Sequence, residues 1–162
     1  MPNYNVQNDM AKTLKDLDDR LRNLENPAPK IQQTRIETLE ATASGTYVDL
    51  ATPGPSLAVQ IGSSGSALIT IQSYCGVNGL AGLQAGAFIG VGIDGALPTG
   101  NLDRLIYYAV SAVAAIGLAG TPSGSAVITG LSQGPHTFKM MYYTASGGTV
   151  SFQKRQLQVT PL

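Results

Sequence analysis

The pattern of apolar residues changes near residue 40 and divides the chain into two parts. In the first part, apolar side chains recur at alternating intervals of four and three residues, at Met10, Leu14, Leu17, Leu21 and Leu24. This spacing places them on one side of a helix and is typical of the a and d positions of a coiled coil. Pro27 and Pro29 cannot continue a helix. The pattern therefore predicts a helix over residues 9–25, followed by a stiff, extended linker.

The charged residues of this helix favour a parallel coiled coil. With Met10 at position d, Arg20 falls at g and Glu25 at the following e, the pair that forms a salt bridge between two chains. Asn8 or Asp9 is expected to cap the helix. Such a helix is about 25 Å long and marginally stable alone, so it needs an oligomer or a docking surface. Leucine at both seam positions fits dimers and trimers alike. Packing of the helix against its own β domain is an alternative.

The second part consists of short runs that alternate between apolar and polar residues. Leu57, Val59 and Ile61, for example, share one face of a strand. Turn sequences rich in glycine and proline separate the runs, which favours an antiparallel β-sandwich. Strands are expected at residues 33–41, 46–51, 56–62, 66–74, 87–94, 104–111, 125–130, 136–144 and 149–160. The predicted fold is mainly β: an N-terminal amphipathic or coiled-coil helix with a Pro-rich linker (residues 1–30), then a jelly-roll-like antiparallel β-sandwich head (residues 31–162).

Two of these runs carry large apolar residues on both faces of the strand. A sandwich strand has one core face, so a second apolar face indicates a further buried surface. We therefore predict an intersubunit surface with the candidate residues Leu105, Tyr107, Tyr108, Phe138, Met140, Met141, Tyr142 and Tyr143. The alternative is an ordinary central strand that loops partly cover. In the last run the apolar positions change parity, which predicts a β-bulge within residues 153–156.

Composition argues against several classes of partner. Residues 1–40 carry six Lys or Arg and seven Asp or Glu, whereas residues 41–162 carry four and three. Because neither part is basic, we expect no nucleic-acid partner and no membrane partner. The single Cys75 allows no disulfide within the chain. No signal peptide is visible at the N-terminus, and the most apolar stretch, residues 105–119, is too short to span a bilayer. We expect a soluble chain made in a cytoplasm.

Candidate catalytic chemistry is sparse. Residues Gly90–Gly95 match GxGxxG, but a turn follows where a dinucleotide site needs a helix, so no cofactor is expected. His136 could join Asp49, Asp94 or Asp103 in a triad, yet no GxSxG motif supplies a nucleophile. A hydrogen-bonded histidine at the start of a strand is the favoured interpretation. The second part contains no Glu and no cluster of His or Cys, so we expect neither a metal site nor an enzyme.

Tyrosines leave carbohydrate binding open, because their rings can stack on sugars. The candidates in the second part are Tyr47, Tyr74, Tyr107, Tyr108, Tyr142 and Tyr143. Tyrosines in alternating strands more often belong to a core or an interface, which is the favoured interpretation.

Three stretches of the sequence resemble small accessory virion proteins of tailed bacteriophages, the head-fibre, capsid-decoration and minor tail proteins. They are SGTYVDLATPGP (44–55), GPHTF (134–138) and RQLQVTPL (155–162). The resemblance covers most of residues 41–162. It implies a trimeric jelly-roll domain, broadly similar to those of the tumour-necrosis-factor type, and an N-terminal segment that anchors the protein to the particle. The chain departs from long tail fibres in having no fibrous shaft.

These observations together predict a non-enzymatic structural protein of a bacteriophage virion. We expect a homotrimer, assembled in the host cytoplasm, whose N-terminal segment binds the major capsid protein or another virion protein. The alternative is a minor tail or receptor-binding protein whose β head binds a host cell-surface glycan. A hydrolase that acts on the cell envelope is a third hypothesis, which would require activity that depends on His136 or an Asp.

Overall fold

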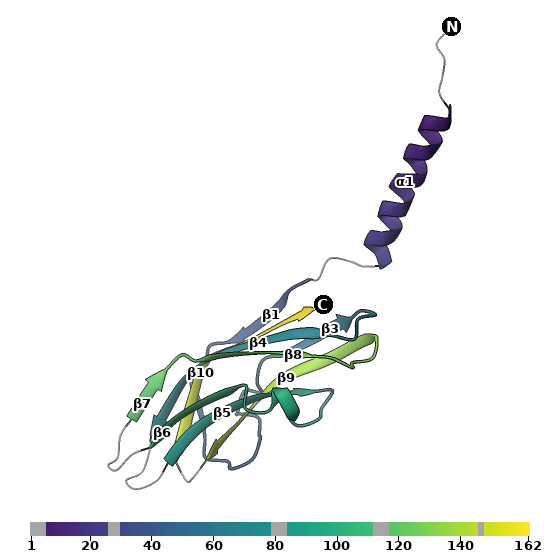
Figure 1. The fold of residues 1–162 in the computed structure, drawn as a ribbon. Helices are drawn as coiled ribbons and strands as arrows, with labels where there is room; N and C mark the ends of the chain where they lie inside the picture. Colours follow the sequence, from purple (N-terminus) through teal and green to yellow (C-terminus); the bar gives the residue numbers. More distant parts are fainter. Residues whose placement is uncertain (1–5, 26–29, 79–83, 112–116, 146–147) are drawn as a thin grey trace. The chain divides into compact units, whose positions relative to one another are not determined.

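The computed structural model describes residues 6–25, 30–78, 84–111, 117–145 and 148–162 (Figure 1). The chain forms two compact units, residues 1–30 and residues 31–162. The first unit contains the helix α1, Val6–Glu25. Within the described residues, the second unit contains the strands and a short 3-10 helix.

Helix α1 begins three residues earlier than the sequence predicts, so Asn8 and Asp9 lie inside it. Neither residue caps the helix, and that prediction is wrong. Asp9 lies in the first turn, where its negative charge interacts favourably with the helix dipole. The backbone oxygen of Asp9 accepts a hydrogen bond of 2.8 Å from the hydroxyl of Thr13. The last helical residue, Glu25, precedes Pro27 by two positions, as expected from the missing N–H of proline.

The second unit is a sandwich of two antiparallel sheets (Figure 1). Sheet A has the order β1-β10-β4-β7, with β2 also beside β10 and β8 also beside β4. Sheet B has the order β3-β9-β5-β6. The strands are β1 Gln32–Ile36, β2 Glu40–Thr42, β3 Ser56–Ile61, β4 Ala67–Asn78, β5 Gln84–Ile93, β6 Ile106–Ser111, β7 Gly117–Gly120, β8 Ser123–Ile128, β9 Gly134–Ala145 and β10 Thr149–Pro161. Strands from the two ends of the chain pair in both sheets, which is the topology of a jelly roll.

The predicted strands agree with the structure in most places and differ in three. The segment expected as one strand at 33–41 is two short strands, β1 and β2. The segment 46–51 is not a strand, although Val48 forms an isolated bridge with Tyr142 of β9. Pro53 and Pro55 follow this segment closely and cannot donate backbone hydrogen bonds, which limits pairing there. The short strand β7 was not predicted, because Gly117–Gly120 (GLAG) has little β propensity.

Apolar side chains from both sheets fill the space between them. Ile69, Ile71 and Leu157 of sheet A are fully buried in one core cluster with Val59 and Ile89 of sheet B. Cys75 lies in the same cluster, and burial raises the pKa of its thiol to about 12. The thiol is therefore protonated and inaccessible at neutral pH.

The predicted bulge in the last strand is confirmed. The register between β10 and β4 shifts between Gln153 and Gln156, and Lys154 adopts a left-handed backbone with φ of 52°. The extra residue changes which face each side chain occupies, so Phe152 and Arg155 both point into the sandwich. This bulge places a cation in the interior.

Candidate assembly surfaces

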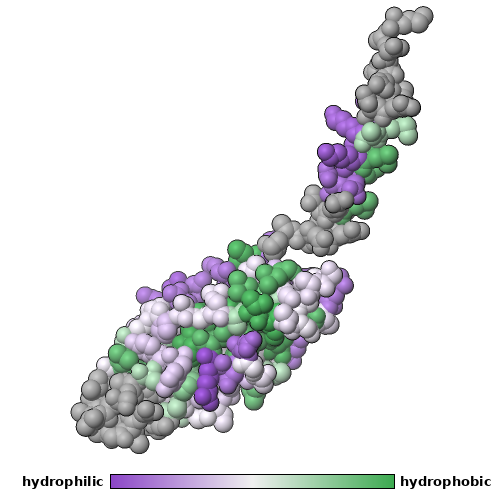
Figure 2. All heavy atoms as spheres, viewed as in Figure 1, coloured by the Kyte–Doolittle hydropathy of each residue, from purple (hydrophilic) through white to green (hydrophobic). Residues whose placement is uncertain are grey.

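Helix α1 carries its apolar residues on one side. Met10, Leu14, Leu17 and Leu21 are between 47% and 63% exposed. In Figure 2, apolar side chains line one side of this helix and polar side chains the other. Arg20 is also exposed, as expected for a position beside a coiled-coil seam. The side chains of Leu24 and Glu25 lie outside the described residues. As a unit, α1 has an apolar stripe that requires a partner.

Three residues of the predicted intersubunit surface are core residues. Phe138, Met140 and Tyr142 are fully buried between the two sheets. Their side chains face sheet A because even-numbered positions of β9 point into the core. They offer no surface to a second chain, and their assignment to an interface is wrong.

The opposite face of β9 and its neighbours carries a row of stacked aromatic rings. Phe88 of β5 lies between Tyr143 of β9 and Tyr107 of β6, with ring centroids 4.4 Å and 4.6 Å away. Tyr47 meets Tyr143 edge-on at 4.7 Å. The guanidinium of Arg104 lies 5.2 Å from the centre of the Phe88 ring. This arrangement buries Phe88 almost completely, although it lies on the outer face of sheet B.

Loops of the same chain cover much of the outer face of sheet B. A Cβ on Gly90 would lie 2.6 Å from the ring of Pro98, and one on Gly92 only 2.3 Å from the carbonyl oxygen of Ala96. Glycine is required at both positions because the segment after β5 crosses directly over them. This segment contains the 3-10 helix η1, Gly100–Leu102. The second apolar face therefore has a partner within the chain, in agreement with the alternative that loops cover a central strand.

Tyr47 connects its own loop to the segment after β5, and both cover the outer face of sheet B. Its hydroxyl donates a hydrogen bond of 2.7 Å to Asp103 and accepts one of 2.9 Å from the backbone N–H of Arg104. Burial is the main cause that raises the pKa of Tyr47 well above its ordinary value. Arg104 needs this support because its backbone is left-handed, with φ of 54°.

The other candidates of this surface differ in exposure. Met141 is half-buried, with its sulfur beside Gly92. Leu105 and Tyr108 are half-buried and pack against the core cluster. Tyr107 is 58% exposed on the edge strand β6. Of the eight residues predicted for the interface, Tyr107 is the most accessible.

The outer face of sheet A carries mainly uncharged polar side chains, with the charged Arg35 on the edge strand β1, and was not identified from the sequence. Cross-strand pairing aligns Gln33, Gln158, Thr70 and Ser125 in one row, and Arg35, Gln156, Gln72 and Ser123 in the next. We define the amide face as Gln33, Thr70, Gln72, Ser125, Gln156 and Gln158. All six side chains are half-exposed or exposed. The alternation of apolar and polar residues along each strand predicts that these six side chains face outward. Their alignment into rows depends on strand pairing, which the sequence alone does not give.

A second polar cluster joins Ser132, His136 and Asp94. Nδ1 of His136 lies 2.6 Å from Asp94, whose other oxygen accepts the N–H of Thr137 at 2.7 Å. Nε2 lies 3.1 Å from the hydroxyl of Ser132 and 2.9 Å from the backbone oxygen of the same residue. The hydrogen bond to Asp94, followed by the one to Ser132, raises the pKa of His136 above 6.5.

These residues have the spacing of a hydrolase triad, and what they can do depends on the protonation of His136. When Nε2 carries a proton, it donates to the backbone oxygen of Ser132, because a carbonyl oxygen only accepts. The doubly protonated ring, whose pKa Asp94 raises, has no lone pair with which to accept the hydroxyl proton of Ser132. The arrangement agrees with the favoured interpretation, a hydrogen-bonded histidine at the start of β9, and we call Asp94, Ser132 and His136 the clasp.

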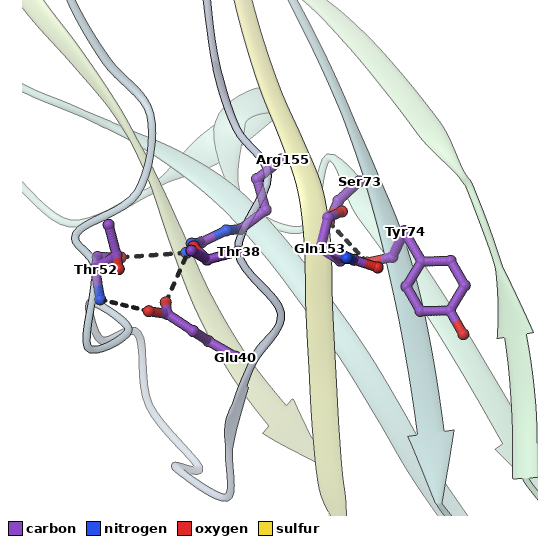
Figure 3. A network of polar contacts seen from close by, with 7 residues as sticks. All are labelled: Thr38, Glu40, Thr52, Ser73, Tyr74, Gln153 and Arg155. Atoms are coloured by element: carbon purple, nitrogen blue, oxygen red, sulfur yellow. Dashed lines mark hydrogen bonds and ion pairs between the residues drawn. The ribbon is translucent and has the colours of Figure 1, made fainter.

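Arg155 belongs to a third polar cluster, which is buried (Figure 3). Its guanidinium is 0% exposed, lies 3.1 Å from Glu40 and donates to Thr38 at 2.9 Å and to the backbone oxygen of Thr52 at 3.2 Å. Glu40 in turn accepts the N–H of Thr52 at 2.8 Å. Burial alone would raise the pKa of Glu40, but the hydrogen bonds from Thr52 and the charge of Arg155 outweigh it, and the pKa lies below 4.5.

The described residues include no group of three or more His, Cys, Asp or Glu that could bind a metal ion. None of the helices described there is long and apolar enough to cross a membrane.

Comparison with known proteins gives remote similarities only. No family model and no curated protein match the chain. A chain of the infectious bursal disease virus Gx strain is 17% identical over 83% of this chain and 32% of its own length, with a TM-score of 0.46. Eiger TNF from S. frugiperda is 11% identical over 83% of this chain and 93% of its own, with a TM-score of 0.45. This chain spans about a third of the length of the bursal disease virus chains. At these scores the similarities transfer no function.

Proposed function

We propose that the chain is a non-enzymatic structural protein of a bacteriophage virion, a homotrimer that decorates the capsid as a head-fibre or decoration protein. Its helix α1 would bind its copies, and the major capsid protein or another virion protein. The observation that carries the proposal is the exposed apolar stripe of Met10, Leu14, Leu17 and Leu21. Complete burial of each such side chain contributes about 1.5–3 kcal/mol.

The β head supports this proposal because its apolar surfaces are buried within the chain. Its core is closed between two sheets, and its second apolar face is covered by its own loops. The ring of His136 is held between Asp94 and Ser132, and its raised pKa favours a structural role for the cluster with the spacing of a triad. We call helix α1 the stem. In a trimer, three stems would bind the same particle at once, so three weak contacts would give a high overall affinity.

A receptor-binding role on the tail is a second candidate, and one observation favours it. Tyr107 is a large aromatic residue, 58% exposed on an edge strand, with one ring face stacked on Phe88. An exposed ring of this kind can stack on a host-surface glycan. A glycan array tests this candidate directly: saturable binding that Tyr107→Ala abolishes would favour it over decoration.

The stem assignment is tested by the double substitution Leu17→Asp and Leu21→Asp in the full chain. Charges in the seam cannot be buried unpaired, so we expect loss of trimer and loss of particle binding while the head remains folded. Sedimentation gives the oligomeric mass, circular dichroism the head fold, and binding to particles that lack the protein the attachment.

The matched control is Lys12→Asp with Lys15→Asp, which places two aspartates on exposed positions outside the seam. This variant should trimerise and bind particles as the wild type does. Normal trimerisation and decoration by the seam variant would contradict the stem assignment.

A further inference from the structure

We infer that the heads of the proposed oligomer meet through the amide face of sheet A, with a second copy of this chain as its occupant. This inference rests on the proposed homo-oligomer and names its head-to-head surface. The sequence pattern predicted that surface on strands of sheet B. In the structure Tyr47, Pro98 and Arg104 of the same chain cover the part of sheet B around β5, whereas the amide face keeps its side chains half-exposed or exposed.

The chemistry of the amide face differs from that of an ordinary solvated sheet face. Its six residues are Gln, Ser and Thr, and the charged side chain in its rows is Arg35 at the sheet edge, which is paired with Glu37. Lys, Glu and Asp are depleted in protein interfaces relative to the rest of the surface. Beside the amide face, the register aligns Leu68 and Val127 with Thr160, and Val127 is 48% exposed. Two apolar side chains next to rows of mainly uncharged polar residues form a surface that another protein can cover.

Symmetry favours a second copy over a different partner. Around a rotation axis a residue comes close to its own symmetry mates, so like charges there would repel. A glutamine amide both donates and accepts hydrogen bonds, and a serine or threonine hydroxyl does the same. Such side chains can therefore pair with copies of themselves. Gln158 and Thr70, in the centre of the amide face, meet this requirement.

The covalent connection to α1 points to the same sheet. Strand β1 of sheet A begins at Gln32, soon after the helical unit ends at Lys30. Residues 26–31 can span at most about 20 Å when fully extended. A linker of this length limits how far β1 can start from the helix of its own chain. Leu68, Val127 and the exposed Ile31 lie at this end of sheet A.

Distances between spin labels in the full chain test the inference. Cys75 is buried and protonated, so an introduced surface cysteine is labelled selectively. We would label Gln158→Cys on the amide face and, as the matched control, Gln60→Cys on the outer face of sheet B. The expected result is a shorter label-to-label distance for position 158 than for position 60. An equal or longer distance at position 158 in a chain of oligomeric mass would overturn the inference.

A pair of lysine substitutions covers the case in which a bulky label disturbs the surface. Thr70→Lys places like charges on the amide face, and Thr137→Lys places them on the outer face of sheet B. We expect Thr70→Lys to weaken association at least about tenfold and Thr137→Lys to leave it unchanged. Equal association of both variants would overturn the inference and leave the proposed oligomer intact.

The outcomes separate the two levels of the proposal. A full chain with the mass of one protomer at all concentrations would contradict the proposed homo-oligomer itself. A monomer whose saturable binding to a glycan is lost in Thr70→Lys would overturn the inference and assign the amide face to sugar. Short distances at position 158, together with weakened association of Thr70→Lys, would support it.

Discussion

The imidazole of His136 connects two loops at one end of the sandwich. It bonds Asp94 in the turn after β5 and Ser132 in the loop before β9. Its pKa is raised above 6.5, chiefly by Asp94, so its contribution to stability is fully present below 6.5 and is lost as the pH rises through the folded-state value. The pKa of Asp94 is lowered below 3.8, chiefly by the N–H of Thr137 and then by His136, so its contribution is lost as the pH falls.

The first prediction follows from these signs. The wild-type protein should become less stable between about pH 6 and about pH 9, as the clasp loses the proton of His136. His136→Gln, which does not titrate, should lack this part of the pH dependence. Urea unfolding of the full chain at both pH values measures the difference. An identical pH dependence in the two proteins would show that the clasp contributes nothing.

The second prediction concerns the buried ion pair of Arg155 and Glu40. Glu40→Met leaves the fully buried guanidinium without its counter-ion, so we expect a loss of about 3–5 kcal/mol in the free energy of unfolding. The double substitution with Arg155→Met should recover part of that loss, because it removes the unpaired charge. The control Glu37→Gln alters an exposed carboxylate paired with Arg35 and should cost less than about 1 kcal/mol. A single variant no less stable than the double one would contradict this account.

At the scale of elements, the bulge in β10 determines which side chains enter the core. Lys154 takes the left-handed conformation that lets Arg155 point inward. A residue with a side chain pays about 1–2 kcal/mol to adopt that conformation. The entropic cost of a glycine there is smaller, about 0.5–1 kcal/mol. We therefore predict that Lys154→Gly slightly raises the melting temperature and that Lys154→Val lowers it, as measured by calorimetry. Equal effects of the two substitutions would argue against a strained bulge.

Sequence patterns predicted the elements that depend on local alternation. Strands β3, β4, β8 and β10 and the bulge follow from periodicity, because each sheet has one face on the core, whereas β6 and β9 were marked by apolar residues on both faces. Segment 46–51 was assigned as a strand on its alternation, but its pairing is limited to the bridge from Val48 to Tyr142. The glycine-rich β7 has no alternation to detect. The repeat of apolar residues from Met10 predicted helix α1, but the helix begins at Val6, before that repeat starts.

The sites were harder to predict because their members lie far apart in the sequence. His136 and Asp94 are separated by 42 positions, and nothing local shows that β5 and β9 bring them together. Glu40 was counted with the charged N-terminal part, so the partner of Arg155 was missed. The second apolar face of β9 was recognised, but sequence could not show that Tyr47 and Arg104 of the same chain cover it.

At the scale of the whole molecule, the proposal assigns different tasks to the two units. Helix α1 supplies an exposed apolar stripe, and burial of that stripe against a partner would stabilise the helix. The jelly roll supplies a stable head whose amide face can meet copies of itself. Neither task requires catalysis, and together they describe a self-assembling structural protein.

The mass of the full chain in solution tests this central claim most directly. Sedimentation equilibrium at several concentrations should give three times the 16.8 kDa of one chain, with dissociation when Leu17 and Leu21 are replaced by Asp. A mass of one protomer at every concentration would contradict the account.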